Sequence, residues 1–257
     1  MLPALSQVLR TDLLLYALVF ARVGAMVATL PALGEAVIPP RVRLILALAL
    51  VILLEPIVAD TYPVGATQKP LMLVGLIALE TLTGLAIGLL LRTVMTAVGT
   101  AGNVIAMQSG LAFAQTFDPS QQTQSALVST FLSLLALVLI FAADLHHLLI
   151  AGIKQSFVLF PPGKMLPTGE FAKLAVETVS EAFTLGVQMA APFLVFGLIL
   201  YGASGVVARL MPQLQIFFLA MPLNILAGFV LLALTLSSMM LWFLDVFAAK
   251  AHLFAPF

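Results

Sequence analysis

The chain alternates long apolar runs with short polar segments, and the lengths of these runs predict membrane-spanning helices. A helix needs about 20 predominantly apolar residues to cross the hydrocarbon core of a bilayer. Runs of about this length or longer cover residues 13–33, 42–59, 71–107, 125–153, 174–211 and 215–247. Prolines and glycines gather between the runs and favour helix ends there. We therefore predict an all-α polytopic membrane protein with about six long helices, and a kink at Pro192 within one of them.

The composition supports the membrane class and excludes several others. Of the 257 residues, 62% are hydrophobic and 9% are charged, whereas a soluble domain has about 25% charged residues. Basic and acidic residues balance at 11 each, which argues against a nucleic-acid partner. The chain has no cysteine, so disulfides and cysteine-based metal or redox sites are excluded. No cleavable signal peptide is evident, and we expect the first apolar run to remain in the mature protein.

One polar segment, residues 107–124, interrupts the apolar pattern in a distinctive way. Its apolar side chains share one face and are Met107, Leu111, Phe113 and Phe117. Gly110 loosens the backbone, and Asp118-Pro119 is a turn and helix-stop signal. Such a segment cannot face lipid, because its peptide groups would lack hydrogen-bond partners there. We interpret it as the lining of a water-filled passage in which apolar side chains form a constriction that excludes water.

Charged residues within the apolar runs are the next candidates for function. Arg22, Glu80 and Arg92 fall inside predicted spans, and buried ionisable groups in helical bundles commonly pair with one another. Glu80 and Arg92 lie twelve residues apart, a rise of about 18 Å along one helix, so each needs a partner on another element. A second hypothesis is a coupling-ion pathway in a stand-alone secondary transporter that uses Glu80, Arg92 or Asp144. No inverted repeat, which many such transporters contain, is obvious between the two halves.

Asp144, His146 and His147 form the one cluster that resembles a chemical site. A metal site would need further ligands from elsewhere in the chain, and a proton relay is an alternative. We favour a solvated helix end over both, and predict no metal and no cofactor. The sequence contains no Ser/His/Asp set in a plausible context, no phosphate loop and no HExxH motif. We therefore predict that the protein is not an enzyme, and an intramembrane enzyme is the least favoured hypothesis.

The spacing of Gly84 and Gly88 predicts a close approach between helices or subunits. Ordinary tolerance of glycine in membrane helices is the alternative explanation.

Five stretches in this order resemble the FliR family, the R subunit of the export gate in type III secretion. They are the Arg22 run with LPALGEAVIPPRVRLILALAL after it, ETLTGLAIGL at 80–89, GLAFAQTFDP at 110–119, the Asp144-Leu-His146-His147 cluster, and ARLMPQLQIFFLAMP at 208–222. The virulence counterpart of this family is the T subunit of the injectisome. Because the five matches run along the whole chain, the resemblance concerns the complete architecture.

The resemblance implies an assembly. Residues 1–165 would correspond to the P subunit of the gate, and residues 166–257 to the helical hairpin of its Q subunit. A single copy would join several P and Q subunits around a pore for unfolded export substrates, beside the gate's switch protein. The resemblance places this assembly in membrane lipid at the bacterial inner membrane, within the flagellar basal body and partly at the level of the periplasm.

The resemblance also assigns roles to residues. The plug loop at 108–124 would close the resting pore, with Phe113 and Phe117 as its main apolar side chains and Met107 and Leu111 beside them. Arg209, Pro212 and Gln213 would form the hairpin turn near the entrance.

Overall fold

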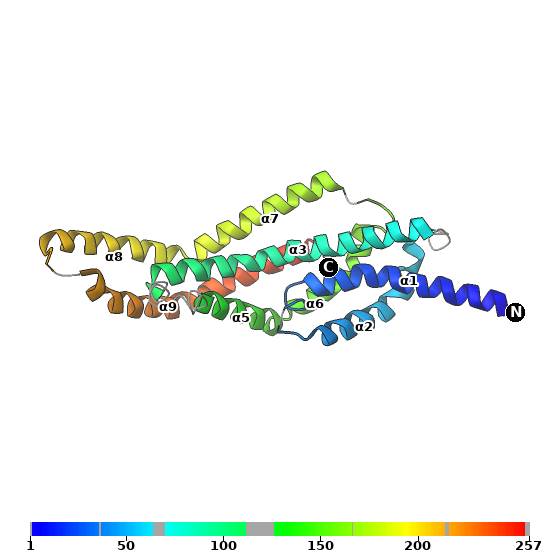
Figure 1. Ribbon diagram of the computed structural model, residues 1–257, viewed down its shortest axis with the longest axis horizontal. Coiled ribbons are helices and arrows are strands. Elements are labelled where there is room, and N and C mark those ends of the chain that lie inside the picture. The colour runs from blue at the N-terminus through cyan, green and yellow to red at the C-terminus, as the bar shows by residue number, and fades with distance from the viewer. Residues whose placement is uncertain are drawn as a thin grey trace. The chain divides into compact units, whose positions relative to one another are not determined.

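The computed structural model describes residues 2–35, 37–63, 70–111, 126–165, 167–213 and 216–254. All regular secondary structure in these ranges is helical (Figure 1). In chain order the helices are α1 (Leu2–Thr29), α2 (Pro40–Val58), the 3₁₀ helix η1 (Ala59–Thr61), α3 (Pro70–Gln108), α5 (Ala126–Ala142), α6 (Leu145–Leu159), α7 (Thr168–Met189), α8 (Ala191–Leu210) and α9 (Ile216–His252). The all-α class is therefore confirmed.

We predict a single helix over residues 125–153, and this prediction is wrong. The chain forms α5 and α6 instead, and their axes are bent by 76° at the break between them. Asp144 lies at this break with φ 57°, in the left-handed region. Aspartate visits this region more readily than most residues, because its short side chain can hydrogen-bond locally. Periodicity could not detect the break, since the apolar pattern continues through it.

The run at 174–211 also contains a break, and here the predicted kink at Pro192 is confirmed. Helix α7 ends at Met189, and Pro192 occupies the first turn of α8. A proline in a first turn removes no hydrogen bond that a helix needs, so it marks a helix start well. With both breaks, the described residues contain eight α-helices rather than about six.

Four helices are long and apolar enough to cross a membrane, or five if the bent α5–α6 pair counts as one span. They cover Pro40–Thr61, Pro70–Gln108, Ala191–Leu210 and Ala220–His252. The predicted first span is shorter than expected, because its apolar helical part covers only Leu13–Thr29. After Thr29 the chain turns through Ala32, whose φ of 68° cannot continue a helix.

The chain divides into two compact units, which we describe separately. Unit 1 contains residues 1–93, 140–178 and 247–257, and unit 2 contains residues 94–139 and 179–246. Both units draw on segments that are far apart in the sequence. The predicted division into a P-like part at 1–165 and a Q-like part at 166–257 concerns likeness to other subunits, and it stays a prediction.

Unit 1 has a core built around α1. Its buried positions recur every three or four residues, as in Val19, Val23 and Met26, which is the spacing of one helix face. Gly84 and Gly88 on α3 meet this helix: an added Cβ would overlap the backbone carbonyl of Arg22 at one position and the Thr29 side chain at the other. The predicted close approach between helices at this glycine pair is confirmed.

Unit 2 buries the second half of α3. The fully buried positions Val98, Ala101 and Ile105 follow the same helical spacing. Helix α8 contributes little to this core, since only 11% of its apolar window is buried inside the chain. Such an apolar helix with an uncovered surface is suited to contact with lipid or with other subunits.

Candidate functional site

The predicted plug loop falls only partly within the described residues. Phe113, Phe117, Asp118 and Pro119 lie outside them. The structure does describe the start of the loop, residues 108–111, which we call the loop foot. Met107, immediately before it, is 64% exposed, so its side chain is available to other molecules rather than packed within this chain.

Helix α3 ends at the loop foot through local hydrogen bonds. The Ser109 amide and hydroxyl both donate to the carbonyl of Ile105, at 2.9 and 2.8 Å. Gly110 follows with φ +76°, and its amide donates to the carbonyl of Met107 at 3.3 Å. A glycine in the left-handed region is a common helix terminator. Helix α3 therefore ends at Gln108, two residues before Gly110 and well before the Asp118-Pro119 signal.

A buried asparagine on α9 holds the loop foot. Asn224 is 4% exposed, and its Nδ2 donates to the backbone carbonyl of Gln108 at 3.2 Å. The close fit depends on Gly110, because an added Cβ there would lie 3.1 Å from Nδ2 of Asn224. One turn further along α9, Gly228 lets the Ser109 side chain approach the helix backbone. The end of α3 is thus seated on α9 through one side-chain hydrogen bond and two close contacts.

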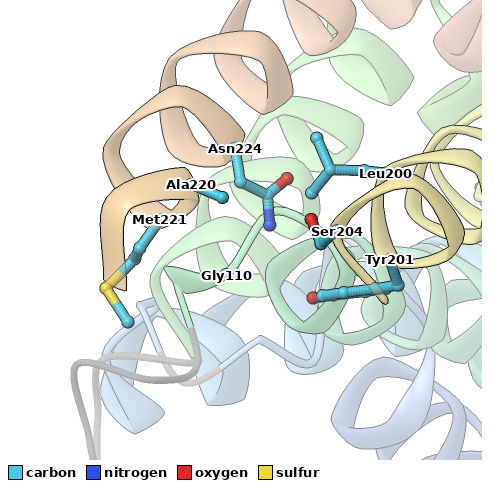
Figure 2. A pocket seen from close by; sticks show the side chains of 7 residues that line it. All are labelled: Gly110, Leu200, Tyr201, Ser204, Ala220, Met221 and Asn224. Carbon is cyan, nitrogen blue, oxygen red and sulfur yellow. The ribbon is translucent and has the colours of Figure 1, made fainter. Parts of the chain in front are cut away.

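Asn224 and its neighbours enclose a small cavity of about 10 Å³ (Figure 2). It is lined by Gly110, by Leu200, Tyr201 and Ser204 of α8, and by Ala220, Met221 and Asn224 of α9. The Oδ1 atom of Asn224 is buried and has no hydrogen-bond partner among the described residues. A cavity of this size is close to the minimum for one water molecule.

Leu111, the last residue of the loop foot, faces a second and larger space. An apolar groove of about 510 Å³ lies between residues of α5 and α9, and Leu111 is part of its lining. Phe131 of α5 and Phe229 of α9 contribute its aromatic side chains. The loop foot therefore lies beside two spaces: the small cavity at Gly110, whose lining includes Asn224 and Ser204, and the apolar groove at Leu111.

Two of the predicted charged residues meet inside unit 1. Nε of Arg22 lies 2.5 Å from Oε2 of Glu80, and the two side chains are 2% and 1% exposed. Nη1 of Arg22 donates to the carbonyls of Ser156 and Phe160, both at 2.9 Å. The guanidinium also lies 4.3 Å from the centre of the Phe157 ring. We call these groups the ionic cluster; it joins α1, α3 and the end of α6.

Tyr62 borders the ionic cluster just after η1. Burial, and then the nearby Glu80 carboxylate, raise the pKa of the Tyr62 hydroxyl. The hydroxyl is buried and close enough to Glu80 to interact with its charge, but its geometry falls outside that of a completed hydrogen bond. Tyr62 therefore stays neutral at any physiological pH.

The structure does not bring the other predicted charges into this cluster. Arg92 is exposed on α3. Asp144 is exposed at the α5–α6 break, and its Oδ1 lies 3.6 Å from Nδ1 of His147. Asp144, His146 and His147 offer ligand atoms within 4.8 Å of one another, the one such group found in the described ranges. Two of the three are exposed, in keeping with a solvated helix end.

The predicted hairpin turn lies between α8 and α9. Arg209, Pro212 and Gln213 are all exposed there. Asn224, by contrast, is a residue that sequence reasoning missed. The available signal was its place as the one asparagine in the charge-free stretch 210–244, since a lone amide in apolar surroundings needs a hydrogen-bond partner.

Comparisons with known proteins find similarity along nearly the whole chain. Residues 13–249 match the model of a family described as bacterial export proteins, family 1. The flagellar biosynthetic protein FliR of Caulobacter vibrioides is 49% identical over 228 residues, which are 88% of this chain and 90% of that protein. The FliR proteins of Escherichia coli and Bacillus subtilis are 32% and 30% identical, each over 91% of this chain and over 88% and 90% of their own lengths.

Proposed function

Because the chain belongs to family 1 of the bacterial export proteins, and is an inner-membrane component of the flagellar export apparatus, we propose that it forms the export pore together with P and Q subunits. In this proposal one copy of the chain contributes the plug loop at 108–124, and unfolded substrates pass the loop when the pore opens. The chain carries out no chemical step of its own. The gate's switch protein is its further partner.

The observation that carries the proposal is the way the loop foot is attached. A plug must stay closed against ions and yet move aside for a polypeptide, so its attachment has to be weak and reversible. Among the described residues, one side-chain hydrogen bond joins the loop foot to another helix, the neutral bond from Asn224 to Gln108, and such a bond contributes about 1 kcal/mol. Gly110 beside it supplies a backbone position of high conformational freedom. Breaking the bond from Asn224 would leave the backbone hydrogen bonds within α3 in place.

The uncovered apolar surface supports an assembly rather than an isolated chain. Large apolar side chains are exposed along α8, including Leu198, Ile199 and Val206. Helices α3 and α9 have 39 and 37 residues, and at about 1.5 Å per residue both exceed the roughly 30 Å of the hydrocarbon core. The parts of these helices beyond the bilayer need cover from other subunits.

The decisive test removes the two plug side chains. In the assembled complex reconstituted into liposomes, we expect the double variant Phe113→Ala and Phe117→Ala to raise resting ion leakage several-fold. The reason is that a constriction without large apolar side chains no longer excludes water. Ion flux is measured with a fluorescent indicator inside the liposomes.

Phe183→Ala serves as the matched control, because Phe183 is exposed on α7 and lies outside the predicted plug. It should leave the leakage unchanged. A double variant that assembles and stays as tight as the unmodified complex would refute the plug assignment. The mass of the intact detergent-extracted particle separates this proposal from a stand-alone transporter, which would purify as an active single chain.

A further inference from the structure

Unit 1 contains an apolar groove of about 730 Å³ between α1, α2 and α3. Its floor on α1 contains the small residues Ala17, Ala21, Gly24 and Ala28, together with Phe20, whose ring lies beside Gly24. These residues cover eleven steps along the helix, a length of roughly 16 Å. This is about half of the roughly 30 Å hydrocarbon core, the depth of one leaflet. The groove thus has the length and the apolar surface to accept an acyl chain.

A positively charged side chain lies in the wall of this groove. Arg43 of α2 is partly buried, and its Nε has no hydrogen-bond acceptor among the described residues. Its Nη1 makes one long bond of 3.4 Å to the carbonyl of Gly34, and none of the described carboxylates pairs with it. A guanidinium has five N–H donors in a fork that matches phosphate oxygens. Arg43 is therefore short of an anionic partner.

The start of α2 adds to the positive potential near Arg43. The helix begins at Pro40 without a side-chain cap. Pro40 has no amide hydrogen, and the amides of Val42 and Arg43 both donate to the Pro39 carbonyl, so the positive charge at this end comes from the helix dipole rather than from free amides. Helix α2 is long and apolar enough to span a membrane, and basic pockets between membrane helices bind anionic lipid head groups.

We infer that the α1–α2–α3 groove binds one anionic phospholipid, with its phosphate on Arg43 and an acyl chain along the small residues of α1. Charge complementarity selects this occupant over an apolar helix of another subunit, because a helix would leave the Arg43 guanidinium without an anion. The inference does not depend on the plug loop and holds whether or not that loop closes a pore.

The test compares two arginines that lie two residues apart. The complex is extracted in mild detergent and titrated with phosphatidylglycerol or with phosphatidylcholine of the same acyl chains, and bound lipid is counted by native mass spectrometry. We expect Arg43→Gln to weaken phosphatidylglycerol binding about tenfold, since bonds to charged groups contribute strongly. Arg43→Lys should bind phosphatidylglycerol more tightly than Arg43→Gln and less tightly than the unmodified complex. Arg41→Gln removes the same charge from an exposed position and should retain the binding.

A second variant tests the floor of the groove. Ala21→Phe places a ring where the acyl chain would lie, so it should reduce the binding of both lipids while Arg43 remains intact. Equal phosphatidylglycerol binding by Arg43→Gln, Arg41→Gln and the unmodified complex would overturn the inference. So would an Ala21→Phe complex that keeps its lipid but loses another subunit, because a protein helix would then occupy the groove.

Discussion

The ionic cluster of unit 1 and the loop foot of unit 2 are both polar sites among apolar helices, yet they are bonded in different ways. The ionic cluster joins three helices through a desolvated ion pair and two bonds from Arg22 to carbonyls. The loop foot has one neutral side-chain bond from Asn224, beside a glycine with positive φ. Removing a partner from the ionic cluster would leave a buried charge unpaired, whereas releasing the loop foot from Asn224 would break one neutral hydrogen bond.

Under the proposed function, this difference corresponds to a fixed part and a movable part of the same chain. A buried charge without its partner is strongly unfavourable, so the helices at Arg22 and Glu80 must stay together. A neutral amide that leaves a carbonyl gives up only about 1 kcal/mol in net terms. Substitutions in the ionic cluster and in the loop foot, made separately, therefore test whether the first is fixed and the second movable.

The largest expected effect comes from removing half of the ion pair. Glu80→Leu leaves the Arg22 guanidinium buried without a counter-charge, and we expect a loss of about 3–5 kcal/mol in the free energy of unfolding. The folded yield after detergent extraction and the midpoint of thermal unfolding measure this loss. Arg92→Gln changes an exposed charge on the same helix and should have little effect.

The double variant Arg22→Met and Glu80→Leu sharpens the result. Apolar replacement of a whole buried ion pair is often neutral or stabilising, so the double variant should recover most of the stability lost by Glu80→Leu. A double variant as unstable as the single one would mean that the bonds from Arg22 to Ser156 and Phe160, rather than the ion pair, hold this site.

A smaller effect is expected at the loop foot from Gly110→Ala. The alanine must adopt the left-handed region, at a cost of about 1–2 kcal/mol, and its Cβ crowds the Asn224 amide at 3.1 Å. Under the proposed function, the resting ion leakage of the reconstituted complex should rise. Gly205→Ala on α8 is the control, because a Cβ there meets nothing within 4 Å and alanine favours the helix. If the Gly110→Ala and Gly205→Ala complexes leaked equally, Gly110 would have no part in closing the pore.

The smallest effect is expected at Asn224. Asn224→Ala removes one hydrogen bond and should cost about 1 kcal/mol. Asn224→Asp should lower the stability more than Asn224→Ala, because an ionised carboxylate cannot donate to the Gln108 carbonyl and is repelled by it. Thermal unfolding of the complex ranks the two variants, with the exposed Asn103→Ala as reference. If aspartate were tolerated as well as alanine, the bond to Gln108 would not hold the loop foot.

Several features of this protein follow from the sequence alone. The apolar runs predicted a helical membrane protein, Pro192 predicted a kink where the chain divides into α7 and α8, and the Gly84–Gly88 pair predicted a close helix approach. These features depend on local chemistry. The length of an apolar run favours a membrane helix, proline lacks an amide hydrogen, and glycine lacks a side chain, whatever the rest of the fold is. The five matching stretches, taken in their order along the chain, also indicated the right family.

The tertiary structure alone decided which polar groups meet. Arg22 and Glu80 are 58 residues apart, and Asn224 reaches a carbonyl 116 residues away, so no local pattern could pair them. The break at Asp144 was hidden as well, because the apolar pattern continues on both sides of it. Partner choice depends on which helices pack together, and that packing is the summed result of many weak apolar contacts along the whole chain.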